Sequence, residues 1–271
     1  MRLGIIATTG LIGLGLMRFY SNSMTKCSQD SKITLENRST EDNKRLISYE
    51  ATRDNEDLRQ EYVNQQFNKN LPYFVSEVIY DPRNVIVRNY ILDLVKDGKM
   101  DEDFADSLLE ELVSNNKISE QFMRNIVATT LFGIKSKTPV FITDRAFKKY
   151  NQNEFCSALI EHEFVHAEDI YNGIKLKCGH VDFRNIDLLS SEVIRSMMEL
   201  RALRNQMTKW IVDGGIAYEL YFVNLSSGFI HYYLTLDKVK PNNSFEVSVR
   251  AELLEQYKKF IPKRFFSKIN P

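Results

Sequence analysis

Two of the four histidines in this chain of 271 residues lie four positions apart, and a glutamate directly follows the first. They are His162 and His166, and the glutamate is Glu163, so the segment has the spacing His-Glu-x-x-His. Residues four apart lie one turn apart on the same face of an α-helix, where both imidazoles can reach one metal ion. Glu163 could accept a proton from a metal-bound water and return it to a leaving amine. The pattern predicts a Zn²⁺ site that hydrolyses a peptide bond.

A catalytic zinc needs a third protein ligand and an open position for water. A second helix is expected to begin near Asp187, a candidate N-cap. We expect Glu192, in the first turn of this helix, to be the third ligand. Glu199, seven residues later on nearly the same face, is the alternative. Cys178 and His180, in the loop between the two helices, are a third possibility because both residue types bind zinc.

Other polar residues near the motif could support the ligands. Carboxylates often orient metal-bound histidines through the outer ring nitrogen, and three candidates are Glu168, Asp169 and Asp187. Arg195, one turn after Glu192, could fix that carboxylate or stabilise an oxyanion, but a surface ion pair explains it equally well. The alternative for the whole motif is a pair of surface histidines on an ordinary helix.

The elements that must position the motif can be predicted from the apolar pattern. Residues 138–143 form a short β-branched and aromatic run opened by Pro139, which favours an edge strand. After Asn153, a candidate N-cap, a helix is expected to run to Gly173. Its apolar residues at helical spacing are Phe155, Leu159, Val165 and Ile170.

Further segments complete an α+β fold that is mostly helical with a small sheet beside the histidine helix. Residues 58–113 contain apolar positions at helical spacing, interrupted by proline and glycine, which predicts several helices. Residues 217–223 and 228–236 are rich in aromatic residues and flank a polar turn, which favours a β-hairpin. We expect one domain over residues 58–271.

The charge balance excludes one class of partner. The chain has 36 Lys and Arg against 36 Asp and Glu, so its formal net charge is zero. Proteins that bind duplex nucleic acid use surplus basic residues on one face to contact phosphates. We therefore expect no nucleic-acid partner. The His-Glu-x-x-His motif predicts a protein or peptide as the substrate.

The N-terminal region has a targeting pattern. Residues 3–17 are uncharged and apolar, with Arg2 and Arg18 on either side and no acidic residue before Asp30, which predicts a mitochondrial transit peptide over residues 1–20. A retained membrane anchor and a secretory signal are the alternatives. As a helix the apolar run would measure roughly 22 Å, shorter than a bilayer core of about 30 Å. The polar residues 21–57 are expected to form a linker.

Three blocks carry a family resemblance: His-Glu-Phe-Val-His-Ala-Glu-Asp at 162–169, Val-Asp-Phe-Arg-Asn-Ile at 181–186, and Ser-Glu-Val-Ile-Arg at 191–195. In content and order they resemble the mitochondrial ATP-synthase-processing metalloprotease family, over residues 138–205. The resemblance implies a zincin-like metallopeptidase fold with Zn²⁺. It also implies an enzyme of the mitochondrial inner membrane or intermembrane space that processes or assembles membrane-sector components of ATP synthase.

The chain also departs from that family. It has three cysteines where family members have many, and its arginine lies three residues after Glu192 where two are expected. A second hypothesis is therefore a catalytically dispensable, protease-derived subunit of a mitochondrial respiratory or ATP synthase complex. Either protein would be a peripheral or N-terminally anchored partner of an inner-membrane complex.

Overall fold

The computed structural model describes a part of the chain that includes the whole motif. The described residues are 46–98, 100, 102, 105–106, 109, 128–130, 137–183, 188–214 and 220–261. They all belong to the second of two units, residues 46–271; the first unit is residues 1–45. The expected targeting segment 1–20 and residues 21–45 of the expected linker lie outside the described residues. Among the described helices, none combines the length and the apolar character needed to cross a membrane.

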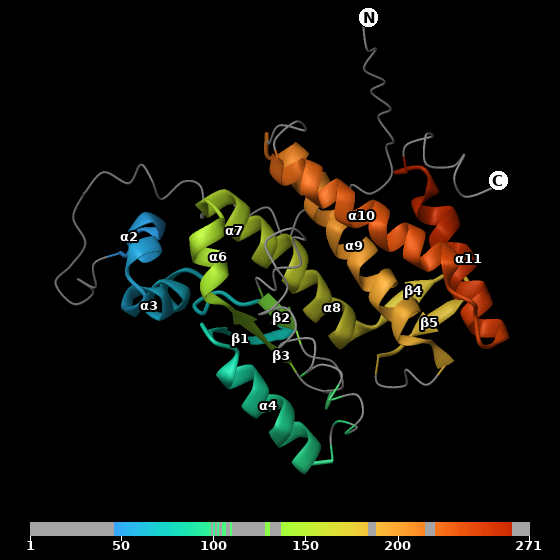
Figure 1. The fold of residues 1–271 in the computed structure, drawn as a ribbon, viewed down its shortest axis with the longest axis horizontal. Helices are drawn as coiled ribbons and strands as arrows, with labels where there is room; N and C mark the ends of the chain where they lie inside the picture. Colours follow the sequence, from blue (N-terminus) through green and yellow to red (C-terminus); the bar gives the residue numbers. More distant parts are fainter. Residues whose placement is uncertain are drawn as a thin grey trace, which may run out of the picture. The chain divides into compact units, whose positions relative to one another are not determined.

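The described elements are mostly helices, with one three-stranded sheet and one two-stranded hairpin (Figure 1), so the fold class is α+β as predicted. In chain order they are α2 (Tyr49–Asp54), α3 (Asp57–Gln66), β1 (Val75–Tyr80), α4 (Val85–Lys96), β2 (Ala128–Thr130), β3 (Thr138–Ile142), α6 (Asp144–Lys149), α7 (Gln152–Ala158), η2 (Leu159–Glu163), α8 (Phe164–Asn172), β4 (Ile174–Leu176), β5 (Gly179–Val181), α9 (Ser191–Val212), α10 (Leu220–Lys238) and α11 (Ser244–Lys258).

Strand β3 lies in the centre of the sheet, whose order is β1-β3-β2, so the predicted edge strand is wrong. It runs parallel to β1 and antiparallel to β2, and all five of its residues are buried. Proline fits there because β2 pairs with β3 only from Val140 to Ile142, beyond Pro139. The register with β1 also shifts next to this position. The proline therefore removes no hydrogen bond that the β2 ladder needs.

The predicted histidine helix is a continuous helical segment built from α7, the π-helical turn η2 and α8. It begins at Asn151 and not at Asn153, because Asn151 and Glu154 form a reciprocal capping box. It ends at Gly173 as expected, where φ is 69°. A Cβ at Gly173 would lie 2.6 Å from the backbone oxygen of Val181, so glycine is required by both conformation and space.

Helix α10 occupies the region where the sequence favoured a β-hairpin, so that prediction is wrong. Its buried residues Tyr221, Phe229, Tyr233 and Leu236 recur at intervals of eight, four and three, which places them on one helical face. This face packs against α9. Packing therefore overrides the strand propensity of the aromatic residues.

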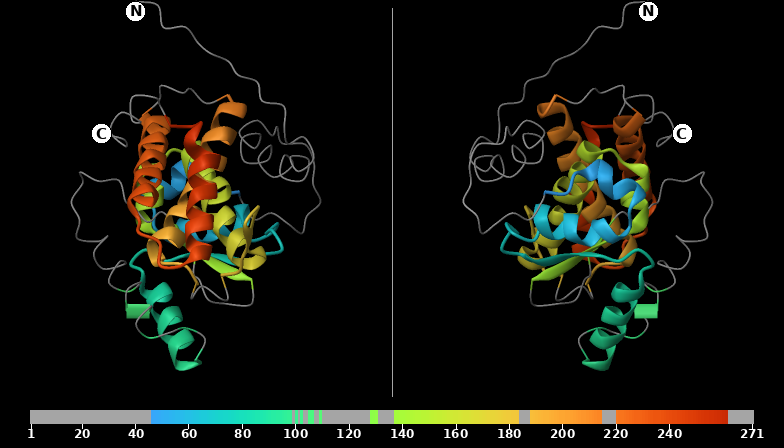
Figure 2. Two further views of the ribbon diagram at one scale, coloured as in Figure 1. Left: turned by 90° about the vertical axis from the view of Figure 1, so that its right-hand side faces the viewer. Right: turned by 90° about the vertical axis from the view of Figure 1, so that its left-hand side faces the viewer.

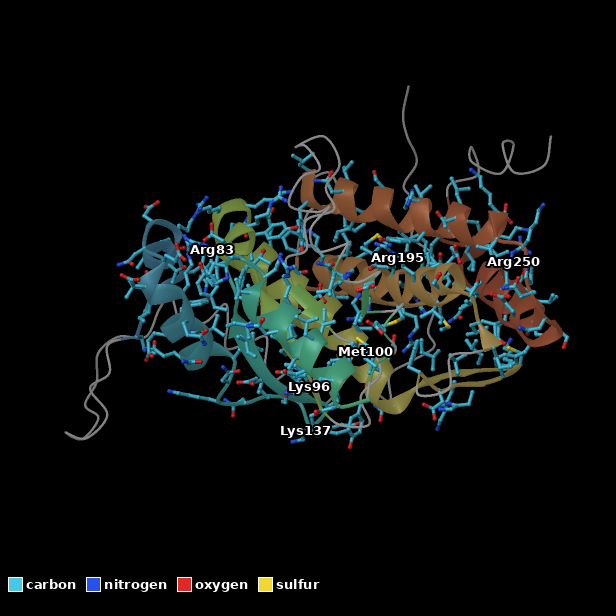
Figure 3. All side chains as sticks on the ribbon, turned by 60° about the horizontal axis from the view of Figure 1, so that its bottom comes forward. Arg83, Lys96, Met100, Lys137, Arg195 and Arg250 are labelled. Atoms are coloured by element: carbon cyan, nitrogen blue, oxygen red, sulfur yellow. The ribbon has the colours of Figure 1, made fainter. Side chains whose placement is uncertain are left out.

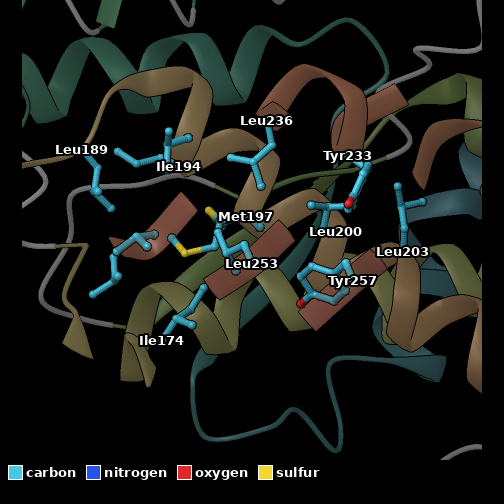
Figure 4. Close-up of a cluster of buried hydrophobic side chains, with 14 of the residues drawn as sticks. Ile174, Leu189, Ile194, Met197, Leu200, Leu203, Tyr233, Leu236, Leu253 and Tyr257 are labelled. Carbon is cyan, nitrogen blue, oxygen red and sulfur yellow. The ribbon is translucent and has the colours of Figure 1, made fainter. Parts of the chain in front are cut away.

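Helices α9, α10 and α11 lie side by side (Figure 2). A large apolar core lies between them. Figure 4 labels ten residues of this core: Ile174, Leu189, Ile194, Met197, Leu200, Leu203, Tyr233, Leu236, Leu253 and Tyr257. Helix α9 also contacts α7, η2 and α8. Helix α9 is thus fixed between the apolar core and the histidine helix.

The predicted linker extends too far, because its last residues belong to the folded unit. The Tyr49 side chain is 1% exposed, stacks on Phe147 and donates hydrogen bonds to the carbonyl oxygens of Ala146 and Tyr150. One aromatic side chain anchors the short helix α2. The composition of residues 21–57 is polar on average, so it did not indicate that Tyr49 would be buried.

Candidate metal centre

Three side chains from three helical elements place their ligand atoms within 4.8 Å of one another. They are His162 on η2, His166 on α8 and Glu199 on α9. The two Nε2 atoms are 3.2 Å apart. Glu199 Oε2 lies 3.5 Å from the Nε2 atom of His162, and Oε1 lies 3.8 Å from the Nε2 atom of His166. This group could hold a metal ion.

These distances can be tested against zinc coordination. Bonds of about 2.0–2.2 Å to nitrogen and oxygen, arranged as a tetrahedron, separate neighbouring ligand atoms by about 3.4 Å. The observed separations of 3.2, 3.5 and 3.8 Å lie close to this value. Two imidazoles and a carboxylate are also an accepted donor set for catalytic zinc. The residues present therefore fit a zinc ion.

Glu199, and not the expected Glu192, lies with the histidines. Glu192 is exposed in the first turn of α9, where its carboxylate accepts a hydrogen bond from the Ser191 hydroxyl. The two glutamates share a helix face, but seven residues correspond to about 10 Å along the axis. The helical period predicts the face of α9, whereas the position of α9 along α8 decides which turn meets the ligands.

The other expected ligands also lie elsewhere. Cys178 is exposed in the turn between β4 and β5, and its backbone N–H donates to the Glu252 carboxylate. Among the described residues, neither Cys178 nor His180 joins a group of metal-ligating side chains. Asp187 lies outside the described residues. Arg195, labelled in Figure 3, is exposed on α9, one turn before Glu199.

The three ligand side chains are partly exposed to solvent. The exposed fractions are 16% for His162, 10% for His166 and 23% for Glu199. Three protein ligands leave one tetrahedral position for water or substrate. Partial exposure together with three ligands favours a catalytic site over a closed structural one, which usually has four protein ligands.

The π-helical turn carries the first half of the motif. Turns of this kind are rare and occur frequently at functional sites. Asn205 on α9 donates hydrogen bonds of 3.0 Å to both the backbone oxygen and the carboxylate of Glu161 in this turn. Burial raises the pKa of Glu161 to about 7. Helix α9 thus supports the widened turn as well as supplying Glu199.

A glutamine supports the first histidine, where the sequence predicted a carboxylate. His162 Nδ1 lies 3.1 Å from Gln206 Oε1. The predicted carboxylate Asp169 instead pairs with Arg201, at 2.8 and 2.9 Å, and joins α8 to α9. The Nδ1 atom of His166 has no hydrogen-bond partner among the described residues. A spacing signal existed for Gln206, because Glu192, Glu199 and Gln206 lie at intervals of seven residues on α9.

The electrostatics favour the unprotonated form of two of the three ligands, His166 and Glu199. Burial, with the neighbouring His162, lowers the pKa of His166 to about 3. Burial alone would raise the pKa of Glu199, but both histidines and Arg195 outweigh it and lower the value to about 2. Burial likewise opposes a proton on His162, yet the hydrogen bond and charge of Glu199 raise its pKa to about 8. Metal ligands must be unprotonated, as His166 and Glu199 are at neutral pH.

Glu163 directly follows His162 at the end of η2 and is 8% exposed. Its negative charge contributes to raising the pKa of His162. It also contributes, after burial and Glu154, to raising the pKa of Tyr150 to about 12. The carboxylate is therefore close enough to His162 to exert an electrostatic effect on that ligand.

Comparison of the chain with protein-family models, with curated proteins and with solved structures found no match. The site is therefore interpreted from its own geometry.

Proposed function

We propose that this protein is a zinc-dependent metalloendopeptidase with a zincin-like fold. The observation that carries the proposal is the convergence of His162, His166 and Glu199 in an arrangement that fits zinc. Glu163, the glutamate of the His-Glu-x-x-His motif, lies beside them. We propose zinc because the His-Glu-x-x-His spacing, with two imidazoles and one carboxylate, is typical of catalytic zinc sites.

The metal and the protein side chains would supply different parts of the reaction. A bound zinc ion would lower the pKa of a water molecule toward about 7 and polarise a substrate carbonyl. Glu163 accepts the proton of the attacking water and delivers it to the leaving amine. Gln206 holds the ring of His162 through its Nδ1 atom, and the three ligand side chains keep 10–23% of their surface exposed.

The finer proposal concerns the substrate and the compartment. The three blocks at residues 162–169, 181–186 and 191–195 support a role in processing or assembling membrane-sector components of ATP synthase. That role would place the protein at the mitochondrial inner membrane or in the intermembrane space. This part of the proposal rests on the sequence resemblance alone.

The test combines metal analysis with hydrolysis. We expect the wild type and Glu163→Gln to bind one zinc ion per chain, and only the wild type to cleave a mixed-sequence peptide library. Loss of the general base should lower the rate by about 10²–10⁴-fold. Failure of the wild type to bind zinc would refute the proposal. Zinc binding without cleavage would instead support the second hypothesis, a catalytically dispensable, protease-derived subunit.

A further inference from the structure

A chain of hydrogen bonds leads from His162 to a helix that contributes no ligand. His162 Nδ1 lies 3.1 Å from Gln206 Oε1. The Gln206 amide nitrogen donates to the Tyr221 hydroxyl at 2.6 Å, and that hydroxyl donates to the backbone oxygen of Glu154 at 3.1 Å. The chain therefore joins η2, α9, α10 and α7. Gln206 is 2% exposed and Tyr221 is 7% exposed.

The last acceptor sets the direction of every bond in this chain. A backbone carbonyl can only accept, so Tyr221 must use its single proton on the oxygen of Glu154. The Tyr221 oxygen can then only accept, which turns the amide nitrogen of Gln206 toward it. The amide oxygen of Gln206 must therefore face His162 and accept a hydrogen bond from its Nδ1–H group.

We propose that Tyr221 and Gln206 are positioning residues that hold His162 in the tautomer whose Nε2 atom is free to bind a metal. A neutral imidazole carries one N–H, so a proton held on Nδ1 leaves a lone pair on Nε2. That Nε2 atom is the one directed at His166 and Glu199. The inference rests on the metal site of the proposed function and extends it to α10.

Reversing the hydrogen bonds between His162, Gln206 and Tyr221 shows what their observed direction prevents. If the Gln206 amide were turned around, its nitrogen would donate to Nδ1 and the single N–H of His162 would move to Nε2. A protonated Nε2 cannot bind a metal. The Tyr221 hydroxyl would then donate to Gln206, and Glu154 would lose this donor. The observed direction retains every bond in the chain.

The Tyr221 side chain is held so that it can perform this role. Its ring lies against Trp210, with centroids 4.7 Å apart, and against Tyr150, at 5.8 Å. Burial raises the pKa of Tyr221 above its ordinary value, so the hydroxyl keeps its proton. Helix α10 thereby acts on the metal site through a single hydroxyl group.

The test uses four variants of the full chain. Gln206→Leu removes the amide, Gln206→Glu keeps an acceptor for Nδ1, and Tyr221→Phe removes only the hydroxyl. The matched control is Tyr233→Phe, because Tyr233 lies on the same helix, is 4% exposed, and donates its hydroxyl to the backbone of Leu254.

Two measurements separate a positioning role from a merely structural one. The first is the ¹⁵N NMR spectrum of the His162 ring in the metal-free protein, above its pKa of about 8. The second is zinc affinity by competition with a chromophoric chelator. Loss of such an outer hydrogen bond typically weakens metal binding by about 10–100-fold.

We expect the wild type and Tyr233→Phe to carry the proton on Nδ1 and to bind zinc with similar affinity. Gln206→Glu keeps an acceptor for Nδ1 and should also carry the proton there. Gln206→Leu should shift the proton toward Nε2 and weaken zinc binding by about 10–100-fold. Tyr221→Phe should change both quantities in the same direction by a smaller factor. If Gln206→Leu does not fold, Tyr221→Phe decides the question, because it removes a single oxygen atom.

Two results would overturn the inference. The first is a proton that stays on Nδ1 in both Gln206→Leu and Tyr221→Phe. The second is an unchanged zinc affinity in both variants. Either result would show that Gln206 and Tyr221 do not hold His162 in the metal-binding tautomer. Failure of the proposed function gives a different result, because the wild type would then bind no zinc. The ¹⁵N measurement uses metal-free protein and still decides the tautomer in that case.

Discussion

Two clusters of buried polar groups in this molecule differ in how their donors and acceptors match. In the first, Arg59 is 2% exposed and its guanidinium also lies over the rings of Tyr80 and Phe147. Each of its nitrogens donates to an oxygen of the chain: those of Thr52, Arg53, Tyr80 and Asp144. This cluster is complete by itself, as a structural cluster should be.

In the second cluster, acceptors face acceptors. With a proton on Nδ1, the Nε2 atom of His162 is an electron-pair donor, and it lies 3.5 Å from a Glu199 oxygen and 3.2 Å from His166 Nε2. Such atoms repel one another unless a positive charge lies between them. The pKa of His162 is raised for the same reason. The Glu199 carboxylate favours a positive charge on the ring and outweighs the opposing effect of burial. Matched donors indicate structure, and converging acceptors indicate a cation site.

The largest effect is expected from adding zinc, which should bind the second cluster and not the first. Zinc at about 1,000 times its Kd should raise the free energy of unfolding of the wild type by about 4 kcal/mol, because only the folded chain assembles the three ligands. Urea denaturation with zinc and with a chelator measures this difference. In His166→Ala the increase should disappear. An equal increase in that variant would place the stabilising zinc elsewhere.

Breaking the matched cluster should reduce stability whether or not zinc is present. Arg59→Met keeps much of the apolar volume but leaves Asp144 without its buried partner, and should lower the free energy of unfolding by about 3 kcal/mol. Urea denaturation of the metal-free protein is the measurement. Lys148→Ala is the control, because Lys148 pairs with the same carboxylate from a side chain that is 64% exposed. That change should cost less than about 1 kcal/mol.

A smaller effect is expected between α8 and α9. Asp169→Asn removes the charge that Arg201 contacts, and Arg201 is 34% exposed, so water replaces part of the interaction. We expect a loss of about 2 kcal/mol in thermal or urea unfolding. If the loss equalled that of Arg59→Met, solvent exposure would not distinguish the two ion pairs.

The smallest expected effect concerns the π-helical turn. Asn205→Ala removes two hydrogen bonds to Glu161 from an exposed side chain, and should cost about 1 kcal/mol of unfolding free energy. Zinc affinity, measured by chelator competition, should change little, because Asn205 bonds to Glu161, which is not one of the three ligands. A loss of zinc binding would show that this amide also sets the ligand geometry.

The local features of the histidine helix could be predicted from sequence. The spacing of His162 and His166 indicated a shared helix face, and Gly173 marked the end of the helix correctly. The choice between Glu192 and Glu199 could not be made, because both lie on one face of α9. Only the packing of α9 against the histidine helix decides which turn meets the ligands.

The contributions of distant segments were missed for the same reason. Tyr221 was assigned to a hairpin because aromatic residues favour strands, and its role depends on α10 packing against α9. Pro139 indicated an edge strand, but the short pairing of β2 leaves room for proline in the central one. In each case a local propensity was overridden by contacts between segments far apart in the chain.

Zinc titration of Glu199→Gln and Glu192→Gln beside the wild type tests the central claim most directly. Both variants exchange one carboxylate for an amide on the same face of the same helix, seven residues apart. The account predicts that Glu192→Gln binds zinc as the wild type does, whereas Glu199→Gln loses more than about 100-fold in affinity, beyond the usual effect of residues outside the ligand set. Wild-type affinity in Glu199→Gln, or its loss in Glu192→Gln, would contradict the account.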